Sequence, residues 1–171
     1  MGVTGTAARV IFAMSALIIS GCGSQEAGSS GAAEDTETEY SVETSADDAK
    51  VTMSGKDGAR IDIDAGPDVA AALPEGFSLY PGARAVSSTQ MQQADGSGVL
   101  VVLESADTPA ALVRFYRDQA EAAGIVIDTE MASAGSTMIQ GESADGRIFS
   151  FNASRSADTA IGQLLIGRDE R

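Results

Sequence analysis

The chain has 171 residues, with 11 Lys and Arg against 25 Asp and Glu, no histidine, one cysteine and a formal net charge of −14. Such an acidic surface disfavours nucleic acid, because phosphates are bound by clustered Lys and Arg side chains. The absence of histidine removes the commonest general base and the commonest transition-metal ligand. The composition therefore predicts no nucleic-acid partner, no metal and no other cofactor.

The first 22 residues are organised like a bacterial export signal. Arg9 precedes an uncharged run from Val10 to Gly21, which is much shorter than the roughly 20 apolar residues that a membrane-spanning helix needs. A short apolar run after a basic residue is typical of a signal peptide. The run ends in Ile19-Ser20-Gly21-Cys22, and this sequence resembles the lipobox of bacterial lipoproteins.

The lipobox resemblance implies cleavage between Gly21 and Cys22, followed by lipidation of the Cys22 sulfur and, commonly, acylation of the new amine with a chain such as palmitate. Cys22 is the sole cysteine, so no intramolecular disulfide can form. Two acyl chains suffice for stable membrane attachment. We expect residues 1–21 to be removed and the exported chain to be anchored through Cys22. Gly23 replaces the Asp that commonly retains lipoproteins in the inner membrane, which favours the periplasmic face of the outer membrane in a Gram-negative cell.

Residues 22–49 have the composition of a disordered tether. They contain eight acidic side chains and no basic one. A segment that is rich in Gly, Ser and acid cannot bury enough apolar surface to offset its ordering entropy. We therefore predict that it holds a folded part, residues 50–171, away from the membrane.

The folded part contains a series of predicted strands and one predicted helix. Apolar residues alternate around Gly55-Lys56-Asp57-Gly58, which predicts a β-hairpin over residues 50–65. In the main body, residues 73–171, turn signals separate further strands. The expected strands are residues 84–92, 98–104, 125–131, 136–141, 147–154 and 159–168.

The predicted helix has clear signals at both of its ends. Thr108 is a good N-cap, and Pro109 suits the first helical position. Gly124 is placed to end the helix in a left-handed conformation. Phe115 and Tyr116 lie about 100° apart around a helix, and we expect Phe115 to be the more deeply buried of the two.

These elements predict an α+β fold, with an antiparallel sheet of about four to six strands, one packed helix and a separate N-terminal hairpin. Leu79-Tyr80-Pro81-Gly82-Ala83 and Phe115-Tyr116 resemble motifs in a group of uncharacterised envelope lipoprotein domains. In that group a tryptophan is expected where Ile125 stands here. The resemblance implies no activity, and its residues have a sufficient explanation as a turn and as core aromatics.

Catalytic constellations are missing from the sequence, so no catalytic, cofactor-binding or metal residue is predicted. Asp62 and Asp64 would share one face of a strand. In a calcium loop that starts at Asp62, however, Gly66, Pro67 and Leu73 occupy the fifth, sixth and twelfth positions, which require an oxygen ligand, a glycine and a glutamate. The favoured hypothesis is a lipid-anchored, non-enzymatic binding or accessory module of the cell envelope. It would meet an envelope protein through the sheet face opposite the helix or through its acidic surface. The alternative is a carboxylate-dependent envelope hydrolase, which requires two acids facing each other across a cleft.

Overall fold

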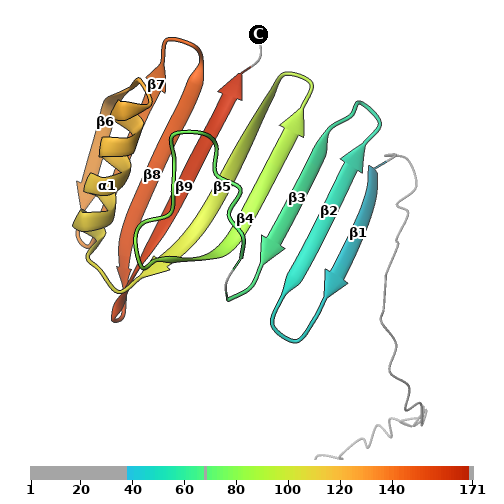
Figure 1. Ribbon diagram of the computed structural model, residues 1–171, viewed down its shortest axis with the longest axis horizontal. Helices are drawn as coiled ribbons and strands as arrows, with labels where there is room; N and C mark the ends of the chain where they lie inside the picture. Colours follow the sequence, from blue (N-terminus) through green and yellow to red (C-terminus); the bar gives the residue numbers. More distant parts are fainter. Residues whose placement is uncertain (1–37, 68, 170–171) are drawn as a thin grey trace, which may run out of the picture.

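The computed structural model describes residues 38–67 and 69–169. In this range nine strands form one antiparallel sheet in the order β1-β2-β3-β4-β5-β9-β8-β7-β6, and one helix covers part of one face (Figure 1). The signal peptide and Cys22 lie outside the described residues. No helix in the described range is long and apolar enough to cross a membrane. The strands are β1 (Thr38–Thr44), β2 (Ala49–Gly55), β3 (Arg60–Ala65), β4 (Arg84–Gln93), β5 (Gly96–Ser105), β6 (Ile125–Ser133), β7 (Ser136–Ser143), β8 (Arg147–Ser156) and β9 (Thr159–Asp169).

The helix-covered half of the sheet holds the hydrophobic core. Helix α1 (Pro109–Ala122) connects β5 to β6, and β6 to β9 then run as a meander that ends beside β5. Alternate residues of these strands point toward α1, as the period of a strand requires. The core contains the buried residues Val99, Val101, Leu103, Leu112, Val113, Tyr116, Ala120, Ile139, Phe149, Phe151, Ala153, Leu164 and Ile166.

The helix ends agree with the sequence signals. The Thr108 side chain accepts a hydrogen bond from the Ala111 N–H, and Pro109 occupies the first turn. Gly124 has φ +79°, in the left-handed region that favours glycine. The expected burial of the two aromatics was wrong: Tyr116 is fully buried, whereas Phe115 is only half-buried at the margin of the core.

The predicted fold class was also wrong, because the protein is mainly β with a single nine-stranded sheet. The β2–β3 hairpin forms where it was predicted, but β3 pairs with β4 along residues 60–65 and so joins the main sheet. Open edges of strands pair wherever their backbone groups meet, and such pairing between distant segments has no local sequence signal.

A strand also lies in part of the segment that was expected to be disordered. Residues 38–44 form β1, which pairs with β2 along its whole length, and β2 itself begins at Ala49. Backbone hydrogen bonding to an existing edge requires little burial, so an acid-rich sequence with Tyr40 and Val42 on alternate positions can still form an edge strand. The remainder of the predicted tether, residues 22–37, lies outside the described range.

Candidate functional site

A cavity of about 860 Å³ lies on the helix side of the sheet, at the C-terminal end of α1. Its walls come from the segment between β3 and β4, from facing parts of β4, β5 and β9, from the last turn of α1 and from the first residue of β8. This volume is in the range of small-molecule sites. The lining residues are Ala72, Leu73, Pro74, Glu75, Gly76, Gln90, Met91, Gln92, Ser97, Gly98, Val99, Ala122, Ala123, Arg147, Ile166, Gly167 and Arg168.

The outer wall of the cavity is a connecting segment that is fastened to the helix and to the sheet. The Ser78 backbone N–H donates to Gln119 Oε1 at 3.0 Å, and the Tyr80 N–H donates to the Tyr116 hydroxyl at 3.2 Å. The Phe77 ring stacks on Phe149, with 5.9 Å between the ring centroids. These contacts hold the segment over the sheet and leave the cavity beside it.

Two apolar cross-strand partners, Val99 of β5 and Ile166 of β9, form the base of the cavity. Both are buried, and Leu73 packs against the same core. The site therefore has an apolar base with room above it.

Two arginines lie at the rim of this cavity. Arg147 and Arg168 are directly opposite each other on β8 and β9. Arg147 Nη2 donates to the Ala123 carbonyl at 2.7 Å, and Arg168 Nη2 lies 2.8 Å from Asp145 Oδ2. Among the lining residues Glu75 is the one carboxylate beside these two arginines, whereas the whole chain has a net charge of −14.

Asp145 orients both guanidinium groups. Its carboxylate accepts a hydrogen bond from the Ser143 hydroxyl and lies 3.4 Å from Arg147 Nε. The pKa of Asp145 is lowered chiefly by the Ser143 hydrogen bond; desolvation, the next-largest effect, opposes this, and the two arginines lower the pKa further. Asp145 and Glu75 together balance the charge of the two arginines, so an anionic group would be held by guanidinium N–H donors and not by a net positive charge.

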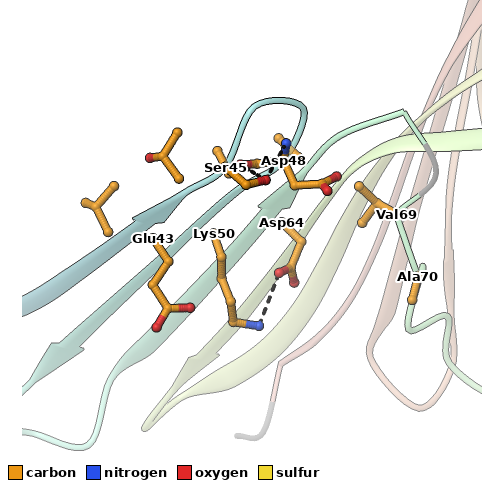
Figure 2. A pocket seen from close by; sticks show the side chains of 11 residues that line it. Glu43, Ser45, Asp48, Lys50, Asp64, Val69 and Ala70 are labelled. Atoms are coloured by element: carbon orange, nitrogen blue, oxygen red, sulfur yellow. Dashed lines mark hydrogen bonds and ion pairs between the residues drawn. The ribbon is translucent and has the colours of Figure 1, made fainter. Parts of the chain in front are cut away.

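A second hollow, of about 850 Å³, lies at the opposite edge of the sheet beside the β1–β2 turn (Figure 2). The register places Lys50 between Glu43 and Asp64 on neighbouring strands. Lys50 Nζ is 3.1 Å from Asp64 Oδ1, and Asp48 lies at the turn. This hollow is open, with charged side chains beside Val42, Val69 and Ala70, and no group of acids in the described residues is arranged to hold a metal ion.

The acid pair singled out in the sequence is divided between different cations. Asp64 pairs with Lys50, while Asp62 lies 2.6 Å from Arg60 Nε and accepts a hydrogen bond from Thr52 at 2.8 Å. The pKa of Asp62 is lowered, first by its hydrogen bond with Arg60 and then by that with Thr52. The two carboxylates share a strand face, but they do not face each other across a cleft.

Sequence analysis missed the cavity, although one signal was available. If β8 and β9 are joined by the turn at Ala157-Asp158, their register follows from counting outward from that turn. The count puts Arg147 opposite Arg168, as the structure does. Gly21 and Cys22 lie outside the described residues, so the predicted cleavage and lipidation sites stay predictions.

Comparison with known proteins gives one similarity. A family model described as START domain-like matches residues 85–159, which run from the beginning of β4 to the first residue of β9 and make up less than half of the chain. START-like domains have a helix-grip fold and are generally binding modules. No curated protein and no solved structure matches the chain.

Proposed function

We propose that this chain is a lipid-anchored, non-enzymatic binding module of the bacterial cell envelope, and that it holds a small ligand in the cavity beside α1. The anchor would be Cys22, which attaches the exported chain to a membrane, and in a Gram-negative cell to the outer membrane facing the periplasm. The observation that carries the binding role is the cavity itself, with an apolar base beneath Leu73 and two arginines at its rim. The START-like similarity supports the proposal, because it spans β4, β5 and α1, which supply much of the cavity wall.

The chemistry of the lining defines the class of ligand. An apolar body would replace water over the partly exposed lining residues Leu73, Pro74 and Ala123, where transfer from water contributes about 25 cal/mol per Å². An anionic group would meet Arg168, whose planar guanidinium suits carboxylates and phosphates. The ligand is therefore a small amphipathic anion. The alternative of a carboxylate-dependent hydrolase has less support, because Asp62 and Asp64 are each engaged by a cation.

The binding test uses two dyes that differ in charge. Anilinonaphthalene sulfonate has an apolar body and an anionic group, whereas N-phenyl-1-naphthylamine lacks the anion. Arg168→Gln should weaken binding of the sulfonate by about ten- to a hundredfold, since a charge-assisted contact contributes about 1.5–3 kcal/mol, and should leave the neutral dye unaffected. Arg155→Gln is the matched control, because Arg155 is exposed on β8 and does not line the cavity.

A steric test locates the dye within the molecule. Gln90→Trp places a large ring in the cavity lining, whereas Gln93→Trp places the same ring at the exposed end of the same strand. Gln90→Trp should abolish fluorescence enhancement by both dyes, and Gln93→Trp should not. Equal binding by the two variants would show that the cavity is not the site.

The anchor is tested separately in cells. Replacing Cys22 by Ser should give a chain that no longer incorporates labelled fatty acid, because the sulfur is the expected lipid acceptor. Normal labelling of that variant would refute the lipid anchor without bearing on the cavity.

A further inference from the structure

The sheet face opposite α1 carries a continuous apolar surface that nothing in the described part of the chain covers. Strand register places its members side by side across β2, β3, β4 and β5, with Val42 of β1 and Leu165 of β9 continuing the row at either end. We call this surface the open band. It consists of Val51, Met53, Ile61, Ile63, Met91 and Leu100.

Each side chain of the open band is half-buried or exposed, and Met53 is 38% exposed. The other face of the same strands is polar near the N-terminus, where β2 and β3 carry Lys50, Thr52 and Asp62. No residue of β1, β2 or β3 is buried in the structure. These three strands thus turn their apolar side away from α1 and contribute no buried side chain to the core.

The open band would be more stable if another layer of protein packed against it. A sheet gains stability when its apolar face packs on another layer, and exposed apolar patches of more than a few hundred Å² mark interaction sites. Ala49, Ala65 and Val102 lie in the next row of the same face, so the uncharged surface around the open band extends over six strands, from Val42 to Leu165, and over five residues of the inner strands. With strands about 4.8 Å apart and a rise of about 3.3 Å per residue, a surface of this size has a plan area of about 500 Å². Two such faces would bury about 1,000 Å² in total, which reaches the lower limit for a specific interface.

Charge decides which occupant suits the open band. Its side chains are uncharged, although the chain carries a net charge of −14. Two copies can therefore approach through this face without bringing their carboxylates together, and the charged faces would be separated by two sheets packed about 10 Å apart. That distance exceeds the Debye length of about 8 Å at physiological ionic strength. A membrane surface with anionic lipids would instead repel the acidic chain.

We propose that two copies of the chain pair through their open bands, face to face, and form a β-sandwich with a helix on each outer side. The interface is isologous, so that the same residues face each other across a two-fold axis. Strand directions in the two sheets would differ by about 30°, as in aligned sheet packing. This proposal does not depend on the ligand cavity, which lies on the helix side of the sheet.

Sedimentation of the full chain with Cys22→Ser tests the pairing without a lipid that would itself cause association. We expect a monomer–dimer equilibrium that Met53→Lys shifts toward monomer by at least about tenfold, because it sets two like charges against each other in a desolvated interface. Met53 is already exposed in the single copy, so lysine is compatible with the folded monomer. Ser54→Lys, on the opposite face of the same strand, is the matched control and should leave the equilibrium unchanged.

Cysteine crosslinking supplies a readout that does not need a disruptive substitution. In the Cys22→Ser chain, Thr89→Cys places a thiol within the open band, between Ile63 and Leu100. Gln90→Cys places the thiol on the opposite face of the sheet, which α1 covers. Sheets about 10 Å apart are too distant for a disulfide, so the crosslinker is a short bismaleimide. It should join the first variant into dimers and should not join the second. A chain that stays monomeric at about 100 μM, equal crosslinking of the two variants, or monomers that bind neutral phosphatidylcholine vesicles through Met53 would each overturn the proposal.

Discussion

Replacing Tyr116 should reveal how much of the domain's stability comes from the contact between α1 and the sheet. Its ring is fully buried and lies 4.3 Å from Phe151 and 5.2 Å from Phe115, measured between centroids. Its hydroxyl accepts a hydrogen bond from the Tyr80 N–H at 3.2 Å. Tyr116→Ala removes the ring and leaves a cavity, so we expect a loss of about 3–5 kcal/mol, comparable with much of the total stability of a small domain.

The hydroxyl contribution can be separated from that of the ring. Tyr116→Phe keeps the packing and leaves the Tyr80 N–H without its acceptor, which should cost about 1–2 kcal/mol. Phe115→Ala should cost less than Tyr116→Ala, because Phe115 is only half-buried. Asp118→Ala on the exposed helix face should change stability by no more than about 0.5 kcal/mol. Denaturant unfolding of the Cys22→Ser chain measures all four.

The burial of Tyr116 should also make the stability of the domain depend on pH. Burial raises the pKa of Tyr116 to about 12, whereas an unfolded tyrosine titrates near 10. Between these values the unfolded state loses its proton first, so stability falls as pH rises from about 10 to about 12, by roughly 2–3 kcal/mol for this group. Tyr116→Phe should remove that part of the decline. If wild type and Tyr116→Phe lose stability in parallel over this range, the buried phenol does not have the environment described.

Three further perturbations probe other parts of the sheet. Ser88 is buried, and its hydroxyl has no hydrogen-bond partner among the described residues, so Ser88→Ala should keep or raise stability by up to about 1 kcal/mol in denaturant unfolding. Asp62 has a lowered pKa beside Arg60, so its contribution to stability is present above about pH 4 and is lost as pH falls through the lowered value. Asp62→Asn should therefore make the unfolding free energy depend less on pH in the acid range, whereas Asp118→Asn should not. Amide exchange should show protection at Ser41 and Glu43, because the register from the Ser45–Asp48 bond makes these the residues of β1 whose N–H groups donate to β2, and exchange there at the free-peptide rate would contradict that pairing.

Local signals in the sequence were enough to predict most individual elements. Thr108 and Pro109 determine where α1 begins, since the cap side chain and the imino ring satisfy the requirements of a first turn. The Asp145-Gly146 turn likewise separates β7 from β8, and Gly146 has φ +79°. These features depend on neighbours in the chain, and so a sequence contains them directly.

Features that depend on distant partners were not predictable in the same way. Phe115 and Tyr116 are adjacent on α1, and only the exact rotation of the helix over Phe151 decides which one is buried. The joining of the hairpin to the main sheet depends on β3 meeting the edge of β4. The cavity exists because the segment before β4 crosses the helix side of the sheet, held by contacts such as Ser78 to Gln119 across 41 residues.

The two proposed surfaces lie on opposite faces of one sheet, and this arrangement predicts that they act independently. Met53 of β2 and Arg168 of β9 are separated by β3, β4 and β5, which at about 4.8 Å per strand corresponds to about 19 Å. Effects at sites more than about 10 Å apart without shared partners usually add within about 0.5 kcal/mol. Pairing through the open bands leaves both cavities on the outside of the dimer, where ligands can still enter. The double variant Met53→Lys/Arg168→Gln should therefore be monomeric and should bind the sulfonate dye as weakly as Arg168→Gln alone. A further loss of dye binding in the monomeric double variant would mean that the second copy completes the site, and the cavity and the open band would then be parts of one functional unit.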